Sequence, residues 1–191
     1  MTIALFKWPF VLFSVPMFSV PIAPDANDIN HMRQALLEAQ KACEKGEVPV
    51  GAVIVLNGQI IGCGFNRREE LQSPLAHAEM LAIESAAAFC HSWRLTGCDL
   101  YVTLEPCIMC IGATLQARIR RLVFGCLDAK AGAVQSLYNL CDDSRLNHRL
   151  PVRGGVLAQE SAALLGSFFN QLREKKSSHR IRRGGRAAEG A

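Results

Sequence analysis

An Asn-Gly pair, Asn57–Gly58, separates two short apolar runs at 50–56 and 59–65, and this feature constrains the fold more than any other. Asn and Gly both accept the positive φ angles of a tight two-residue turn, so the pattern predicts an antiparallel hairpin. The chain therefore contains at least one antiparallel pair of strands.

Helices and further strands are predicted on both sides of this hairpin. Apolar residues recur at helical spacing between Ile29 and Cys43, with Asp28 as the predicted N-cap and Gly46 as the stop. After the hairpin we expect a loop at 66–74, a helix at 75–89, a strand at 99–104, a helix at 106–117 and a strand at 121–124. This alternation predicts an α/β fold with a mixed sheet and helices on both faces.

The length of 191 residues suits one domain. Beyond residue 128 the pattern loosens into a polar region, until a last amphipathic helix is predicted at 159–172. We therefore place the folded domain at 28–172. The segment 173–191 contains seven Lys or Arg residues and is predicted to be a disordered basic tail. Such a tail either contacts a polyanion or keeps the protein in solution.

The first 27 residues form an apolar, Pro-rich extension that we expect to be poorly ordered. The run from Trp8 to Ala23 follows Lys7 and superficially resembles a secretion signal. Prolines between Pro9 and Pro24 would break the helix that a signal or a membrane span requires. Most of the eight cysteines stand alone in apolar stretches, which favours a reducing compartment. We expect a cytoplasmic protein without a membrane anchor.

Two short segments carry side chains suited to chemistry. The first is His77-x-Glu79, and after 26 further residues comes Pro106-Cys107-x-x-Cys110. Each segment is predicted to begin a helix, with Pro106 at the first helical position. Cysteines three residues apart share a helix face and, with one imidazole, supply three ligands for a tetrahedral zinc ion. Three ligands leave the fourth position for water, and Glu79 is the nearby carboxylate that can carry protons.

Each segment also has a plainer explanation when it is taken alone. His77 and Glu79 could be ordinary residues of a first helical turn, and the cysteines could fill the core or form a redox pair. A redox pair needs neither His77 nor Glu79, so the joint pattern favours a catalytic zinc site. A purely structural zinc site would need a fourth protein ligand, and the other cysteines have no paired spacing.

Between about residues 31 and 169 the chain resembles the bacterial tRNA-specific adenosine deaminases of the cytidine deaminase-like superfamily. Besides the two zinc motifs, the resemblance is carried by Glu47–Val53, Gly64–Arg67, Tyr101–Cys110, Val123–Gly125, Asp128–Lys130 and Asn147–Arg149. It implies a three-layer α-β-α sandwich with a mixed five-stranded sheet, one Zn²⁺ ion per subunit and a homodimer.

The resemblance also implies a reaction and a set of residue roles. The reaction is hydrolytic deamination of adenosine to inosine at the wobble position of a tRNA anticodon stem-loop, chiefly that of an arginine tRNA. Zinc would be bound by His77, Cys107 and Cys110, and Glu79 would transfer protons. Asn66 and the backbone of Ala78 would hold the base. The groove for the anticodon loop would be lined by Asp128, Lys130, Asn147, His148 and Arg149.

Two alternatives remain at this point. The same zinc motif serves deaminases of free bases or nucleotides, such as guanine, cytosine or dCMP. An alternative of another class is a nucleic-acid-binding module with a structural zinc, in which Glu79 would have no role. The family pattern explains neither the N-terminal extension nor the basic tail.

Overall fold

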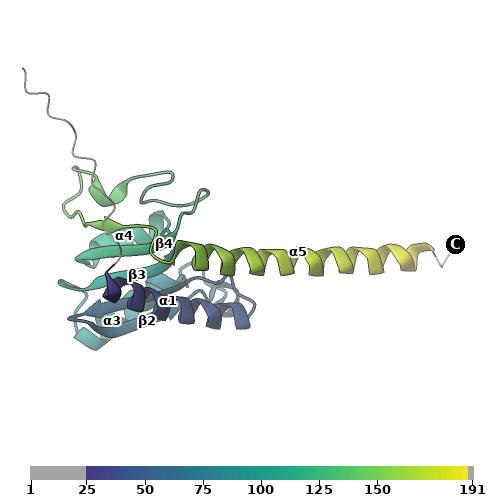
Figure 1. Ribbon diagram of the computed structural model, residues 1–191, viewed down its shortest axis with the longest axis horizontal. Coiled ribbons are helices and arrows are strands. Elements are labelled where there is room, and N and C mark those ends of the chain that lie inside the picture. Colours follow the sequence, from purple (N-terminus) through teal and green to yellow (C-terminus); the bar gives the residue numbers. More distant parts are fainter. Residues whose placement is uncertain (1–24, 189–191) are drawn as a thin grey trace, which may run out of the picture.

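A five-stranded sheet forms the centre of the computed structural model, which describes residues 25–188 (Figure 1). Its strands are β1 (Gly51–Leu56), β2 (Gln59–Phe65), β3 (Asp99–Leu104), β4 (Arg121–Cys126) and β5 (Val152–Arg153). They lie in the order β2-β1-β3-β4-β5. β1 pairs antiparallel with β2 and β3, whereas β3, β4 and β5 run parallel. The mixed five-stranded sheet is therefore confirmed.

The hairpin between β1 and β2 has the predicted turn. Leu56 pairs with Gln59, and the two residues between them have φ angles of 50° at Asn57 and 80° at Gly58. Both angles lie in the left-handed region that Asn and Gly tolerate best. The local sequence thus fixes the register of this pair of strands.

Helices cover both faces of the sheet, as three layers require. They are α1 (Ala26–Glu44), α3 (Ala78–Cys90), α4 (Ile108–Gln116) and α5 (Ala158–Ala188), whereas the one-turn helix α2 (Arg68–Leu71) has no buried residue. Alternate residues of β1 divide between two cores, since Ile54 packs with α3 and α4 whereas Val53 packs with α1. This division follows from the two-residue period of a strand. α5 lies beside α1 and crosses β4, where Ser161 faces Gly125.

Small residues let α3 approach the sheet closely. A Cβ atom at Gly62 or Gly64 of β2 would overlap the backbone of α3 at Ala82 or Ala78. The facing helix residues are themselves fully buried alanines. This close contact between the glycines of β2 and the alanines of α3 sets the distance of α3 from the sheet. It therefore also sets the position of the His77–Glu79 segment at the start of α3.

The first helix is capped by Asp25, so the prediction of Asp28 as its N-cap is wrong. The Asp25 carboxylate accepts hydrogen bonds from the backbone amides of Asn27 at 2.6 Å and Asp28 at 3.0 Å. Both acids have the residue type of an N-cap, and the earlier one satisfies the first free amides. Asp28 instead turns inward and is fully buried against Tyr101 and Arg121.

Other element boundaries also differ from the predictions. The predicted loop at 66–74 contains the one-turn helix α2, and the helices predicted from 75 and 106 begin at Ala78 and Ile108. Pro106 is therefore not the first helical residue, because Cys107 is the extended N-cap, with φ −76° and ψ 174°. The polar region after 128 also contains a short 3₁₀ turn (Leu140–Asp142) and the two-residue strand β5. Strands and turns this short leave almost no periodic pattern in a sequence.

α5 is longer than the helix predicted at 159–172, because it continues through the basic segment to Ala188. Figure 1 shows it extending far beyond the sheet. Residues 173–188 are thus helical in the structure, where the sequence predicts a disordered tail, and a helix already nucleated gains one hydrogen bond for each further residue. The extension at 1–27 lies outside the described residues up to 24, and its last residues begin α1. Among the described helices, none is long and apolar enough to span a membrane.

Candidate metal centre and active site

Two helix N-termini meet at the carboxyl end of β3 and bring the predicted metal ligands together. His77 is the N-cap of α3, and Cys107 is the N-cap of α4. Cys110 lies one turn into α4 and is fully buried. Neither N-cap side chain forms a capping hydrogen bond with its own helix. The positive ends of two helix dipoles therefore face this point, where they favour thiolate over thiol.

The three donor atoms have the spacing of a tetrahedral metal site. The two Sγ atoms are 3.7 Å apart, and Nδ1 of His77 lies 3.7 Å from Cys107 Sγ and 3.4 Å from Cys110 Sγ. Zinc bonds of ordinary length in a tetrahedron place sulfurs about 3.8 Å apart and a sulfur about 3.6 Å from a nitrogen. The cysteines are not joined by a disulfide. Three of four tetrahedral positions are thus supplied by the chain.

The thiols are poised for metal binding rather than inert. The hydrogen bond shared with Cys110 lowers the pKa of Cys107 to about 3, and His77 beside it adds to the effect. The same shared hydrogen bond and burial raise the pKa of Cys110 well above its usual range. The two sulfurs therefore share one proton. A metal cation that binds both sulfurs as thiolates displaces this proton.

Glu79 stands beside the three donors, in the first turn of α3, and only 4% of it is exposed. Burial raises the pKa of its carboxyl group above the usual value. It lines a pocket of about 210 Å³ together with His77, Ala78 and Cys107. A buried carboxyl group next to a metal site, with a cavity in front of it, can exchange protons with a bound molecule.

Asn66 lines the same pocket from the end of β2 and is held by a second buried acid. Its Nδ2 atom donates to Oε2 of Glu47 at 3.2 Å, and the other oxygen of Glu47 accepts from the backbone amide of Glu70 at 2.7 Å. A carboxylate only accepts hydrogen bonds, so the Asn66 atom that faces Glu47 is the amide nitrogen and not the amide oxygen. Oδ1 of Asn66 therefore remains as an acceptor for a ligand.

A loop after β4 forms the opposite wall of the pocket through Asp128 and Ala131. One oxygen of Asp128 accepts from the amides of Lys130 at 2.9 Å and Ala131 at 3.2 Å, which shapes the turn. Lys130 itself is exposed and does not line the pocket. The structure thus places Asn66, Ala78 and Asp128 in the wall of the pocket that His77 and Cys107 also line.

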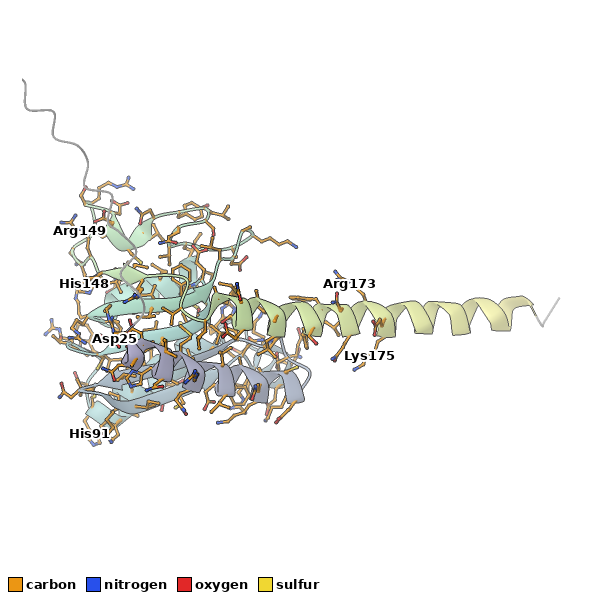
Figure 2. The ribbon with its side chains drawn as sticks, viewed as in Figure 1. Asp25, His91, His148, Arg149, Arg173 and Lys175 are labelled. Carbon is orange, nitrogen blue, oxygen red and sulfur yellow. The ribbon has the colours of Figure 1, made fainter. Side chains whose placement is uncertain are left out.

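Asn147, His148 and Arg149 are not brought to this pocket. Nε2 of His148 lies 2.8 Å from the carbonyl oxygen of Ile119, and Asn147 accepts from Arg118 at 2.9 Å. These contacts are beyond the carboxyl end of α4, whereas the metal ligands are at its amino end. Figure 2 shows His148 and Arg149 on the side of the molecule where Asp25 begins α1. Arg149 borders a separate cavity of about 720 Å³ beside β5.

Two buried acids near the pocket, Glu47 and Glu105, received no role from the sequence, although only 2% of each is exposed. Glu105 lies in an apolar stretch, Leu104-Glu105-Pro106, whereas Glu47 follows the charged and polar segment Glu44–Gly46. An acid inside an apolar run is a signal that could have identified Glu105, because such a group is buried only when it is hydrogen-bonded. The sequence around Glu47 carries no such signal.

Fold and site together define a metal-dependent deaminase domain. The chain matches the family described as the cytidine and deoxycytidylate deaminase zinc-binding region over residues 25–126. It is 49% identical to the tRNA-specific adenosine deaminase of Bacillus subtilis over 150 residues, 78% of this chain and 93% of the relative. The corresponding protein of Aquifex aeolicus is 50% identical over 142 residues, 74% of this chain and 93% of that one.

Solved structures agree with this similarity. A structure from a study of A-to-I editing by tRNA:A34 deaminases has a TM-score of 0.69 and 45% identity, and covers 71% of this chain and 98% of its own. The guanine deaminase of Nitrosomonas europaea shares the fold, with a TM-score of 0.64 at 24% identity over 88% of this chain and 97% of its own. The chain therefore belongs to the zinc-binding deaminase family, and within it to the tRNA-specific adenosine deaminases. Its cofactor is zinc.

Proposed function

We propose that this protein converts adenosine to inosine at the wobble position of a tRNA anticodon by hydrolytic deamination. The observation that carries the proposal is one pocket lined by His77, Cys107 and the buried Glu79, with the third donor, Cys110, buried within 4 Å of His77 and Cys107. The names of the relatives that are nearly half identical support the choice of an adenosine in tRNA. An arginine tRNA is the expected substrate from the family resemblance.

His77, Cys107 and Cys110 are the proposed zinc ligands, because their mutual distances match three corners of a tetrahedron. When bound there, zinc supplies a nucleophilic oxygen at neutral pH by lowering the pKa of water to about 7. Glu79 takes the proton released by the attacking water and delivers protons to the ring nitrogen and to the leaving ammonia. Water and adenosine thereby give inosine and ammonia.

The base enters the pocket out of its stack, which an anticodon loop permits at a cost of about a few kcal/mol. Asn66 offers Oδ1 to the bound nucleoside, since its Nδ2 atom is engaged by Glu47. The backbone of Ala78 lies between His77 and Glu79 and contacts the base edge. Asp128 faces the nucleoside from the other wall.

The wider RNA surface is proposed to include Lys130 near the pocket and, farther away, Asn147, His148 and Arg149. The distance of the last three from the metal centre means that they contact a different part of the stem-loop from the target base, or an RNA held by a second subunit. The working assembly in this proposal is a cytoplasmic homodimer. Exposed apolar side chains that follow or precede the ligands in sequence, such as Leu75 and Ile108, support a subunit contact there.

The test compares substrates and one substitution. The zinc-loaded protein should deaminate an anticodon stem-loop and leave free adenosine, guanine and cytosine nearly untouched. Glu79→Gln should lower kcat by a factor of about 10² or more while zinc content stays at one equivalent. Glu84→Gln, an exposed acid on the same helix, is the matched control. Preference for a free base would replace this proposal with the free-base alternative, and full activity of Glu79→Gln would leave only a structural role for the metal.

A further inference from the structure

Glu105 connects β3 to the metal centre, yet its carboxylate is directed to a loop that is distant in sequence. The residue follows the last residue of β3 and precedes Cys107 by two positions. Although it borders the pocket, both of its oxygens are engaged by other groups of the chain. The proposed reaction assigns it no part.

Five donors converge on this one carboxylate. Oε1 accepts from the backbone amides of Val134 at 3.1 Å, Gln135 at 2.7 Å and Ser136 at 2.9 Å. Oε2 accepts from the amide of Asp128 at 3.0 Å and from the hydroxyl of Ser136. An ionised carboxyl group offers about four lone-pair sites, so its capacity is filled. One buried side chain thus holds both ends of the segment 128–136, which we call the pocket loop.

The rest of the pocket loop is fitted to the same support. The amide of Ala133 donates to the carbonyl oxygen of Pro106 at 2.9 Å, and Gly132 forms an isolated β-bridge with Cys107. A Cβ atom at Gly132 would overlap the Glu105 carboxyl group, so a glycine is required for this close approach. The loop therefore has one docked position, and that position places Asp128 and Ala131 in the pocket wall.

We propose that Glu105 is a positioning residue for substrate recognition, which holds the pocket loop in the shape that meets the bound nucleotide. The proposal rests on the function given above and names how one wall of that site is made. Without these hydrogen bonds the loop would have to be ordered at the moment of binding, and that cost reduces affinity. The chemical step, which depends on Glu79 and the metal ligands, would change little once substrate is bound.

The decisive variant is Glu105→Gln in the full-length, zinc-loaded protein. Its amide nitrogen would face amide donors of the loop, so at least part of the network is lost. We expect amide hydrogen exchange at 128 and 134–136 to accelerate by about tenfold or more, the equivalent of one charge-assisted hydrogen bond. KM for the stem-loop should rise by about the same factor, with kcat within about threefold. Zinc content should stay at one equivalent.

A milder variant, Ser136→Ala, removes only the hydroxyl donor and should shift exchange and KM in the same direction by a smaller factor. Ser144→Ala, in the exposed loop that follows, is its matched control. Unchanged exchange in both Glu105→Gln and Ser136→Ala overturns the proposal, as does a fall in kcat at constant KM. Loss of zinc from Glu105→Gln also overturns it, because Glu105 would then support the metal centre. If Glu105→Gln does not fold, the Ser136→Ala result decides by the same criteria.

These readouts separate this proposal from the proposed function. Failure of the unsubstituted protein to act on a stem-loop would refute the proposed function. The hydrogen-exchange result would still show whether Glu105 holds the pocket loop. Faster exchange without a change in KM would show that the loop is held by Glu105 but plays no part in recognition, and this outcome refutes the inference alone.

Discussion

The two ends of the parallel strands β3 and β4 each hold a buried cluster of polar groups, and the clusters are built on opposite principles. At the amino ends, the fully buried Asp28 accepts from the hydroxyl of Tyr101 at 2.8 Å and from Arg121 at 2.8 Å. Arg121 also pairs with Asp99 at 2.9 Å. Burial and the hydrogen bond to Asp28 raise the pKa of Tyr101, so this hydroxyl stays protonated. Every charge in this cluster has a partner within the chain.

At the carboxyl ends, the groups face a cavity and their capacity is incomplete. Among the residues that the structure describes, His77, Cys107 and Cys110 converge on one point without a fourth protein donor, and the buried Glu79 lies beside them in the pocket wall. Burial alone therefore does not distinguish a functional cluster from a structural one. The distinguishing feature is the unfilled coordination on the side of the pocket. Four changes to the chain test this contrast, and their expected effects range from loss of activity to a few-fold change in RNA affinity.

Replacing a proposed zinc ligand should abolish activity. Cys107→Ala removes one of three protein bonds to zinc, so we expect less than one equivalent of bound metal, no measurable deamination and a lower Tm. Metal analysis together with thermal unfolding measures all three. Cys63→Ala, at an exposed cysteine of β2, should keep full zinc and activity. A Cys107→Ala protein with a full equivalent of zinc would remove this residue from the ligand set.

Breaking the cluster at the amino ends should affect stability instead of chemistry. Arg121→Ala leaves the carboxylate of Asp28 buried with fewer partners, and we expect the free energy of unfolding to fall by about 3 kcal/mol. Activity per folded molecule should be unchanged at low temperature. Arg120→Ala removes an arginine whose side chain is 63% exposed, and should cost at most about 1 kcal/mol. Equal costs for the two variants in denaturant titrations would contradict the contrast between paired and open clusters.

Asn66→Ala should slow deamination without disturbing the metal. It removes the proposed acceptor for the nucleoside, so kcat/KM should fall by a factor of about 10 to 100, which corresponds to about 1.4 to 2.7 kcal/mol of lost transition-state stabilisation. Zinc content should remain at one equivalent. Asn170→Ala on α5 provides a control for the same change in side chain. Kinetics equal to those of the unsubstituted protein would exclude Asn66 from the substrate site.

The smallest effect is expected from deleting everything after Leu172. The removed part of α5 carries Arg173, Lys175, Lys176, Arg180, Arg182, Arg183 and Arg186. Figure 2 shows the first two on the helix beyond the sheet. If these residues contact phosphates, RNA affinity falls by about a few-fold and its salt dependence flattens by about 0.7 to 0.9 in log–log slope for each lost contact. The rate of the bound complex should not change. If the full chain and the truncated protein have the same RNA affinity and the same salt dependence, the segment after Leu172 only helps to keep the protein in solution.

Much of the fold could be predicted because its signals are local. The Asn57–Gly58 turn, the helical periodicity of α1 and the β-branched run of β1 each act over a few residues, and the structure has all three. The errors lie where a distant residue decides. Asp28 has the chemistry of an N-cap, but Tyr101 and Arg121 bind it in the interior, and β5 is a strand only because it pairs with β4.

The chemistry of the centre was determined by the sequence itself. The identities and spacings of His77, Glu79, Cys107 and Cys110 predict a metal site and a proton carrier, because ligand type and helix geometry are local properties. Tertiary structure alone decided what surrounds them. It places Glu47 behind Asn66 and Glu105 beneath the pocket loop, and it separates His148 from the metal by the length of α4. The physical reason is that a buried carboxylate is tolerated only where backbone and side-chain donors converge from distant segments, and no local pattern records that convergence.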